Sequence, residues 1–241
     1  MGAVTNISET KHDCFGLDVT DDEIRRWDKL TGAHPKGSLP ERPDMWDNEL
    51  FVPPTYLVGG IVVELGCGMG HWGREVAKYA ATYVGIDISR YSIHKARSLH
   101  VAWDNMRFYH SVDDIQSIQC LTGKVLGVYG ISFFIHQPKC RFETIVGFAS
   151  NMLMPGGWLS VDYVLGKYGH RHNQPAEGAD WRSFNRTASA LEVVLGANGL
   201  YEYQHHVSPN PNYDVNGVPR RGYVVSYKPL DSVRGADHAS I

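Results

Sequence analysis

The chain has 241 residues, of which 43% are hydrophobic and 20% are charged, and its formal net charge is −3. This length suits one well-filled core of α/β size, or at most two small domains. Proteins that bind the phosphates of a nucleic acid normally have an excess of basic residues or a stripe of them on the surface. This sequence has neither, so we expect no nucleic-acid partner.

Three further features of the sequence predict a cytoplasmic protein that does not bind a membrane. The longest uninterrupted apolar run, Ile61–Val63 with Leu65 following, is far too short to span a bilayer. At the N-terminus, no basic residue followed by an apolar stretch marks a signal peptide. The four cysteines form no C-x-x-C pair, which is typical of free thiols in a reducing compartment.

The first 55 residues carry few periodic signals. Residues 1–18 are polar and aperiodic, and we expect them to be mobile. Thr20 or the aspartate after it can cap a short helix. The rest of the segment 19–55 is rich in proline and charge, and its anchors include Trp46 and Phe51. We expect it to form an irregular arm or lid.

From residue 55 to residue 228 the pattern is regular. Strands are expected at 60–65, 83–88 and 106–111, within 124–134, and at 156–165, 200–208 and 220–229. Helices are expected at 71–81, 92–104, 140–153 and 181–197. Such alternation is typical of βαβ units and a parallel sheet, whereas the last two strands share a hairpin connection and are antiparallel to each other. No linker divides the chain, so the sequence predicts a single domain with a tail at 229–241.

The segment "VVELGCGMGHWG", residues 62–73, contains two overlapping glycine patterns. Counted from Gly68 it satisfies G-x-G-x-x-G, the turn that binds dinucleotides. Counted from Glu64 it is an acid followed by glycines at every second position. Both patterns place a cofactor where a strand ends and a helix begins, because a Cβ atom there would block the turn or the cofactor.

The surrounding residues fit the dinucleotide pattern poorly. The strand ends at Leu65, so the first glycine of the turn is Gly66, and G-x-G-x-x-G counted from there requires glycine at His71. Glu64 would also place a carboxylate beside a pyrophosphate, and like charges repel. A cofactor that carries an ammonium and a sulfonium group would instead benefit from an acid near the turn.

The segment from Glu64 to Gly70 resembles the glycine-rich motif of class I S-adenosylmethionine-dependent methyltransferases. The Pro155-Gly156-Gly157 turn and the terminal hairpin, in the same order as in that family, extend the resemblance over residues 55–228. It implies a Rossmann-like, seven-stranded mixed sheet with helices on both faces and an antiparallel hairpin of the last two strands. It also implies S-adenosylmethionine as cofactor and S-adenosylhomocysteine as product.

The resemblance implies which residues bind this cofactor. Asp87, at the end of the second strand, would accept two hydrogen bonds from the ribose diol. After the third strand, an acid would receive the adenine amino group. Asp113 lies near that point, but a simple alignment places Val112 there. The implied cofactor-binding residues are Glu64, Gly66, Cys67, Gly68, Gly70, Asp87, Ile88, Val112 and Asp113, with Cys67 a small filler rather than a nucleophile.

Two residues are candidates for the transfer step. Methyl transfer needs an aligned nucleophile and, where that nucleophile is protonated, a base. His136 follows the fourth strand, where the family places residues near the transferred methyl group, and Asp162 ends the fifth strand. His136 and Asp162 would form a base with an orienting carboxylate. Alternatively, His136 caps the following helix or packs beneath the cofactor.

The absence of two kinds of motif narrows the range of substrates and cofactors that we expect. The chain has no Asn-Pro-Pro-Tyr after the fourth strand, which argues against methylation of nucleobase amino groups. No acid follows that strand to hold magnesium, and the His170-Arg171-His172 triplet is weak as a zinc motif without nearby acids or cysteines. We therefore expect no metal.

These observations predict an enzyme that methylates an oxygen or nitrogen of a small molecule, such as a specialised metabolite. Three alternatives stay open: a protein that binds S-adenosylmethionine or S-adenosylhomocysteine without catalysis, an aminopropyl transferase-like enzyme, and a dinucleotide oxidoreductase. The sequence leaves the acceptor, the pathway and the oligomeric state open, a dimer included.

Overall fold

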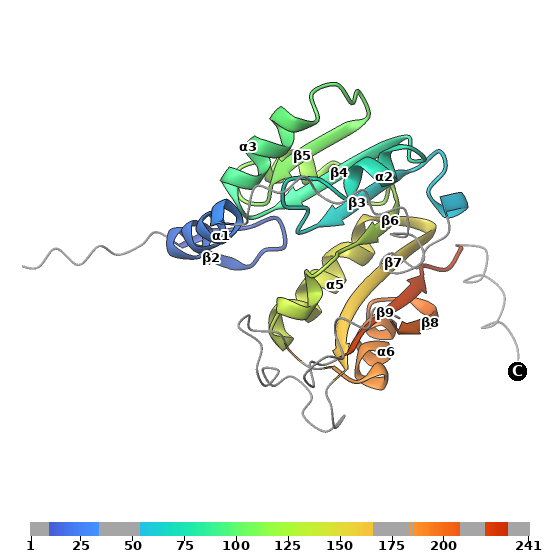
Figure 1. Cartoon of the computed structure of the whole chain (residues 1–241). Coiled ribbons are helices and arrows are strands. Elements are labelled where there is room, and N and C mark those ends of the chain that lie inside the picture. Colours follow the sequence, from blue (N-terminus) through green and yellow to red (C-terminus); the bar gives the residue numbers. More distant parts are fainter. Residues whose placement is uncertain (1–9, 34–53, 166–183, 185, 208–219, 231–241) are drawn as a thin grey trace, which may run out of the picture.

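The computed structural model describes residues 10–33, 54–165, 184, 186–207 and 220–230. Seven strands form one sheet in the order β5-β4-β3-β6-β7-β9-β8 (Figure 1). Their bounds are β3 (Ile61–Leu65), β4 (Thr82–Asp87), β5 (Met106–His110), β6 (Val125–Tyr129), β7 (Leu153–Leu165), β8 (Tyr201–Val207) and β9 (Arg220–Tyr227). The first five are parallel, and β9 is antiparallel to both of its neighbours, β7 and β8. The predicted mixed sheet is confirmed.

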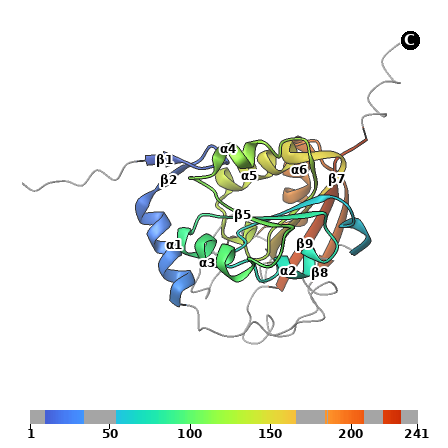
Figure 2. The same ribbon diagram turned by 90° about the horizontal axis from the view of Figure 1, so that it is seen from above.

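Helices cover both faces of this sheet. They are α2 (Gly73–Ala77), α3 (Arg90–Leu99), α4 (Ile115–Gln119), α5 (Lys139–Met152) and α6 (Ala188–Ala197). Figure 2 shows α4, α5 and α6 along one face and α2 and α3 along the other. Strand side chains alternate between the faces, so Val63 and Leu65 join the core under α4 and α5, whereas Val62 joins the core under α2 and α3. The side chain of Glu64 therefore points to the same face as Val62.

The N-terminal segment differs from the prediction. Although the sequence of residues 10–18 shows no periodic pattern, β1 (Thr10–His12) and β2 (Asp18–Thr20) form an antiparallel hairpin. The hairpin is anchored by Cys14, which is buried, and whose amide donates to the Ser111 carbonyl oxygen (2.7 Å). A segment this short carries too few apolar residues for the pattern to be recognised, and its partner lies almost a hundred residues further along the chain.

Helix α1 (Asp21–Ala33) follows the hairpin. Its N-terminus is capped as predicted, because the Thr20 hydroxyl oxygen accepts from the Glu23 amide (3.2 Å). Figures 1 and 2 both place α1 and the hairpin at the end of the sheet where the parallel strands finish. The predicted anchors Trp46 and Phe51 lie outside the described residues.

Two element boundaries also differ. The last helix begins at Ala188, where Thr187 accepts from the Ala190 amide (3.3 Å), rather than at 181. Strand β7 begins at Leu153, before the Pro155-Gly156-Gly157 segment, because a shift in register against β6 lets the strand continue through that segment. Within the described residues, no helix has the length and apolar character needed to cross a membrane.

Candidate functional site

The glycine-rich turn follows β3 directly, since that strand ends at Leu65 as predicted. Gly66, Gly68 and Gly70 all have positive φ angles, of 71°, 53° and 74°. Other residue types rarely adopt this conformation, so the backbone itself explains why glycine occurs at every second position. The Gly66 amide donates to the carbonyl oxygen of Ile86 on β4 (2.8 Å), which ties the turn to the next strand.

The three glycines differ in what surrounds them. A Cβ atom added at Gly66 would lie 2.6 Å from the Phe133 ring, and one added at Gly70 would lie 2.4 Å from the Phe108 ring. At Gly68 the same atom would have no non-neighbouring atom within 4 Å. The turn is therefore packed at Gly66 and Gly70 and leaves open space at Gly68, where a ligand can approach the backbone.

A cavity of about 550 Å³ lies at the carboxyl ends of the parallel strands. The sheet order changes direction between β3 and β6, and open α/β sheets bind ligands at such a switch point. Of the predicted site residues, Gly66, Asp87, Ile88 and His136 line this cavity. The other lining residues are Asp13, Phe15, Leu17, Asp22, Glu23, Arg26, Trp27, Ile86, Ser111, Ser132, Phe133, Gln137, Pro138, Arg141, Ile145 and Phe184.

Asp87 connects the glycine turn to the start of α3. Its Oδ2 accepts from the Gly68 amide and its Oδ1 from the Ser89 amide, both at 2.8 Å. Burial raises the pKa of Asp87, while these amides and His110 oppose the shift. A carboxylate offers about four acceptor positions, more than its backbone amide neighbours use, so acceptor capacity stays available for a ligand.

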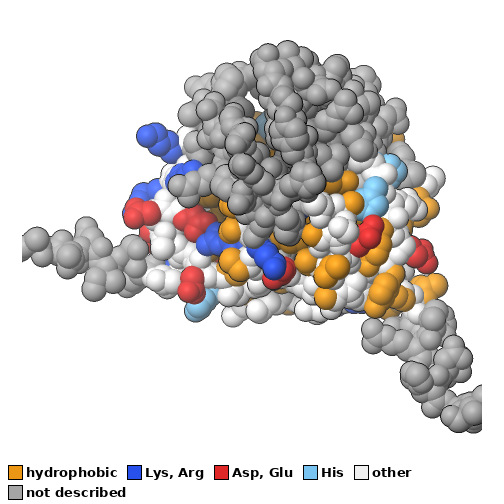
Figure 3. Space-filling view, turned by 90° about the horizontal axis from the view of Figure 1, so that it is seen from below, with side chains coloured by type: hydrophobic (Ala, Val, Ile, Leu, Met, Phe, Trp, Pro, Cys, Tyr) orange, Lys and Arg blue, Asp and Glu red, His pale blue; other side chains and the backbone are white. Residues whose placement is uncertain are grey.

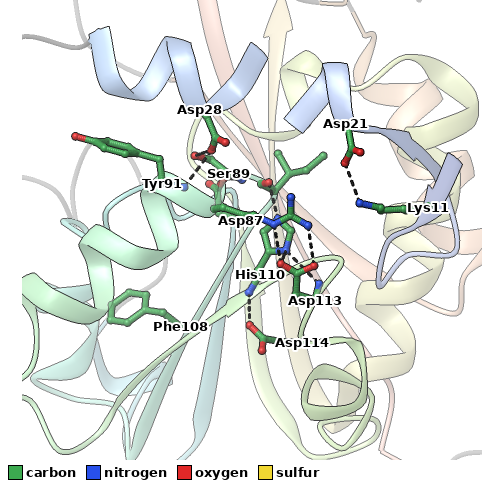
Figure 4. A network of polar contacts seen from close by, with 12 residues as sticks. Lys11, Asp21, Asp28, Asp87, Ser89, Tyr91, Phe108, His110, Asp113 and Asp114 are labelled. Atoms are coloured by element: carbon green, nitrogen blue, oxygen red, sulfur yellow. Dashed lines mark hydrogen bonds and ion pairs between the residues drawn. The ribbon is translucent and has the colours of Figure 1, made fainter. Parts of the chain in front are cut away.

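Helix α1 contacts the same corner of the site. Its Asp28 accepts from the Ser89 hydroxyl (2.6 Å) and from the Tyr91 amide (3.0 Å), and Ser89 itself caps α3. Figure 4 shows Asp28 next to Ser89 and Asp87. On the other side, His110 Nδ1 accepts from an amide of the turn after β5, which leaves Nε2 to donate to the Ile88 carbonyl oxygen (2.8 Å). The loop that carries Asp87 is thus fixed from two directions.

Glu64 is buried, in a cluster with two tyrosine side chains of neighbouring strands. Only 1% of it is exposed, and its Oε2 accepts from the Tyr83 hydroxyl (2.5 Å) and the Tyr129 hydroxyl (3.0 Å). Burial raises its pKa to about 8, although both hydroxyl groups oppose the shift. Glu64 is not among the residues that line the cavity, and its predicted contact with a cofactor stays a prediction.

The other predicted cofactor residues have different surroundings. Asp113 is half exposed and accepts two hydrogen bonds from Arg90 (2.8 and 2.9 Å), which lower its pKa. Cys67 is buried, and burial raises the pKa of its thiol, which fits a filler rather than a nucleophile. Val112 is partly buried and, like Asp113, does not line the cavity.

Ser111, which the sequence did not suggest, does line the cavity. It is 2% exposed, and its hydroxyl has no hydrogen-bond partner among the described residues. Native proteins rarely leave such a group unpaired, so this hydroxyl is a candidate for a hydrogen bond with a ligand. Its place directly after β5 is a usable signal, because carboxyl ends of parallel strands meet at one edge.

His136 lies in the 3₁₀ turn η3 (Phe134–His136), which follows β6. Its ring faces Trp27 of α1, with the ring centroids 6.3 Å apart. Asp162 is fully buried on β7, and its Oδ1 accepts from the Phe134 amide at the start of the turn (2.9 Å). Arg186 donates to the carbonyl oxygens of the same turn. Asp162 and Arg186 therefore position the turn that carries His136.

No group of three metal-ligating side chains occurs among the residues that the structure describes. His170 and His172 lie outside them. All four cysteines are free, as predicted: Cys14 and Cys67 are buried, and Cys120 and Cys140 are exposed.

Residues 62–157 match the family model of a methyltransferase domain. Comparison of the sequence with curated proteins gives no significant match. Among similar solved structures is 1,6-didemethyltoxoflavin-N1-methyltransferase of Burkholderia thailandensis, with bound 1,6-didemethyltoxoflavin and S-adenosylhomocysteine. It is 16% identical, with a TM-score of 0.60, over 86% of this chain and 88% of that one.

Magnesium protoporphyrin IX methyltransferase of Synechocystis PCC 6803, with bound S-adenosylhomocysteine, is 18% identical, with a TM-score of 0.54, over 71% of this chain and 75% of that one. The [4+2]-cyclase SpnF is 15% identical, with a TM-score of 0.55, over 86% and 83%. At such identities the likeness concerns the fold, and these three proteins are named for different reactions.

Proposed function

Because the chain carries a methyltransferase domain and has the fold of class I S-adenosylmethionine-dependent methyltransferases, we propose that it methylates an oxygen or nitrogen of a small molecule. When bound, the cofactor supplies an electrophilic methyl group on a sulfonium. S-adenosylhomocysteine is then the product.

The observation that carries this proposal is the joint placement of Asp87 and the glycine turn on one cavity. The Asp87 carboxylate keeps acceptor capacity, which suits the hydroxyl groups of a ribose. Gly66 of the turn and the unpaired Ser111 hydroxyl line the same cavity, and the open space at Gly68, whose amide donates to Asp87, leaves room for a ligand. The residues present therefore fit an adenosyl cofactor.

Gly73 is the last glycine of the dinucleotide pattern, and a Cβ atom there would lie 2.2 Å from the Tyr83 ring. The third glycine of a dinucleotide turn serves such helix–strand packing too, so this glycine fits both alternatives. Titration with NADH separates them.

His136 and Trp27 form the wall on which we place the acceptor. Alignment of an acceptor against the cofactor can supply much of the rate, and a base adds about 10²–10⁴-fold. In this proposal His136 takes the proton from a protonated acceptor, while Asp162 holds the Phe134 amide and so fixes the turn.

The cavity favours a small acceptor, because about 550 Å³ is typical of small-molecule sites. On the face shown in Figure 3, the Lys and Arg side chains that can be seen lie among Asp and Glu side chains, and the described residues form no continuous basic stripe there. The four free thiols fit the reducing cytoplasm. We place the enzyme there.

Titration calorimetry with S-adenosylmethionine, S-adenosylhomocysteine and NADH tests the proposal. We expect micromolar binding of both adenosyl ligands and an affinity about 100-fold lower in Asp87→Asn, since two charge-assisted hydrogen bonds weaken. Asp104→Asn is the matched control, because Asp104 is exposed and precedes β5 at the opposite end of the strands.

NADH binding, or adenosyl binding unchanged in Asp87→Asn, would contradict the cofactor assignment. Bound cofactor then justifies a screen of small acceptors, with methyl gain followed by mass spectrometry. Turnover separates methyl transfer from non-catalytic binding, and transfer of an aminopropyl group would give a different mass.

A further inference from the structure

Two buried polar side chains near Asp87 have not yet been given a ligand group to contact. They are Asp13, in the turn of the β1–β2 hairpin, and Ser111, directly after β5. Both line the cavity that Asp87 lines. A chain of backbone hydrogen bonds joins the three segments: the Ser111 amide donates to the Asp87 carbonyl oxygen (2.9 Å), and the Cys14 amide donates to the Ser111 carbonyl oxygen (2.7 Å).

The Asp13 carboxyl group is held in place by its own turn. Its Oδ1 accepts from the amides of Phe15 and Leu17, both at 2.9 Å, and the residue is only 7% exposed. No hydrogen bond from the described residues reaches Oδ2. Burial raises the pKa of Asp13, and the two amides oppose that shift. The fold thus keeps a poorly solvated acceptor at the cavity wall.

The charged groups near Asp13 are already paired with each other. Arg141 lies close enough to lower the pKa of Asp13, and Glu23 close enough to raise it. The Arg141 guanidinium donates to both carboxylate oxygens of Glu23 and to the Asp18 carbonyl oxygen (2.8 Å). Arg141 is thus directed at Glu23 and Asp18, and no hydrogen bond from it to Asp13 is formed among the described residues. Asp13 Oδ2 can therefore accept from a donor on a ligand.

Asp13 and Ser111 together offer an acceptor and a hydroxyl that can donate. Strand β5 is the neighbour of β4, so the end of β5, where Ser111 lies, is within reach of a base whose ribose is held by Asp87. Adenine presents an exocyclic amino group, a donor, beside a ring nitrogen, an acceptor. Val112 and Asp113 do not line the cavity, and Asp113 is paired with Arg90.

We propose that Asp13 and Ser111 recognise the amino edge of the cofactor's adenine, so that the N-terminal hairpin completes the cofactor site. Asp13 accepts from the amino group, and the Ser111 hydroxyl donates to a ring nitrogen. This inference rests on the proposed function. It assigns base recognition to a segment that precedes the sheet in sequence.

The test compares S-adenosylhomocysteine with S-inosylhomocysteine, whose base carries an oxygen in place of the amino group. A buried carboxylate facing that oxygen is left without a donor, so wild type should bind the adenosyl ligand about 10- to 100-fold more tightly. Asp13→Asn keeps an oxygen for the Phe15 and Leu17 amides, and its amide group can donate to the oxygen of the inosyl base. The preference should fall to within about threefold of unity.

Asp18→Asn, in the same hairpin and with an exposed side chain, is the matched control and should keep the wild-type preference. Thermal unfolding of each variant reports whether the hairpin still folds. Should Asp13→Asn not fold, Ser111→Ala replaces it, and we expect it to lower affinity for the adenosyl ligand about threefold to tenfold with an unchanged Tm.

An undiminished preference in Asp13→Asn would overturn the inference while leaving the cofactor assignment intact. If wild type bound neither ligand, the proposed function itself would fail, and the inference with it. The two failures are therefore distinguishable in one set of titrations.

Discussion

Glu64 and Asp87 lie on neighbouring strands, and the sequence pattern assigns both to the cofactor. The fold gives them different surroundings. Asp87 lines the cavity and accepts from two backbone amides with acceptor positions to spare, whereas Glu64 is sealed against two tyrosine hydroxyls. Both side chains belong to the same face of the sheet, so the difference comes from their position along the strands: Glu64 pairs with Gly85 inside the sheet, whereas Asp87 is the last residue of β4, at the edge where the cavity lies. We therefore expect changes at Glu64 to affect stability and changes at Asp87 to affect binding.

Removal of the Glu64 carboxyl group should have the largest effect on stability. Glu64→Ala leaves the hydroxyl groups of Tyr83 and Tyr129 without an acceptor in a buried site and opens a cavity. Each unsatisfied group costs about 1–3 kcal/mol, so we expect a loss of about 3 kcal/mol or more in the free energy of unfolding. Chemical denaturation measures this loss, and calorimetry should show a Tm lower by about 6 °C or more.

Two variants make the comparison with Asp87 direct. Glu64→Gln keeps an oxygen for the tyrosines and should lose at most about 1 kcal/mol. Asp87→Asn keeps an oxygen for only one of the Gly68 and Ser89 amides, so it should lose some stability, but less than Glu64→Ala, while it loses affinity for the adenosyl ligand. Equal destabilisation by Glu64→Ala and Asp87→Asn would show that the two acids do not differ in the way their surroundings indicate.

Local signals were enough to find the central part of this site. The end of β3, the positive φ angles after it and the acid that ends β4 all leave marks within a few residues of sequence. These features locate Gly66, Gly68, Gly70 and Asp87 at the ends of two strands, whereas the order of the strands in the sheet came from the structure.

Contacts between distant residues decide the parts that sequence reasoning missed. Glu64 accepts a hydrogen bond from Tyr129, which is 65 residues away in sequence, and no local sequence pattern predicts that contact. Cys14 meets Ser111 through a backbone hydrogen bond that depends on hairpin geometry. Asp113 has nearly the spacing of an adenine ligand, but Arg90 lies near enough to pair with it. These contacts become visible only in the three-dimensional structure.

The open space at Gly68 can be tested against a second glycine of the same conformation. Gly123, in the turn before β6, also has a positive φ (71°) and no non-neighbouring atom within 4 Å of an added Cβ. Alanine at either position incurs a similar backbone strain of about 1–2 kcal/mol. Because only Gly68 lies beside Asp87, Gly68→Ala should weaken S-adenosylhomocysteine binding by at least about 10-fold in calorimetry.

Gly123→Ala should bind the ligand as wild type does, since the turn before β6 lies at the other end of the strand from the cavity. Similar losses of affinity in both variants would mean that backbone strain, and not the methyl group at Gly68, lowers binding.

The smallest expected effect is a dependence of stability on pH that comes from Glu64. Its pKa is about 8 in the folded chain and about 4.3 when unfolded. Between these values the folded chain holds a proton that the unfolded chain has released. The stabilising contribution is therefore full below the unfolded pKa and is lost as pH rises through the folded one, with a slope of up to about 1.4 kcal/mol per pH unit.

The difference between wild type and Glu64→Gln from pH 6.5 to 8 isolates this contribution. His71, His100 and His206, whose pKa values burial lowers (that of His71 to about 4), have the opposite effect, which fades as pH rises above the unfolded histidine value of about 6.5 and is common to both proteins. Asp87 is the charged group that raises the pKa of Glu64 further, so a cation bound at Asp87 would shift the window downward. Urea denaturation of ligand-free wild type and Glu64→Gln should give a falling free energy of unfolding in the first and a flatter line in the second. Parallel lines would mean that Glu64 is ionised in the folded chain at pH 6.5, and that the tyrosine hydroxyls, rather than a proton, compensate its burial.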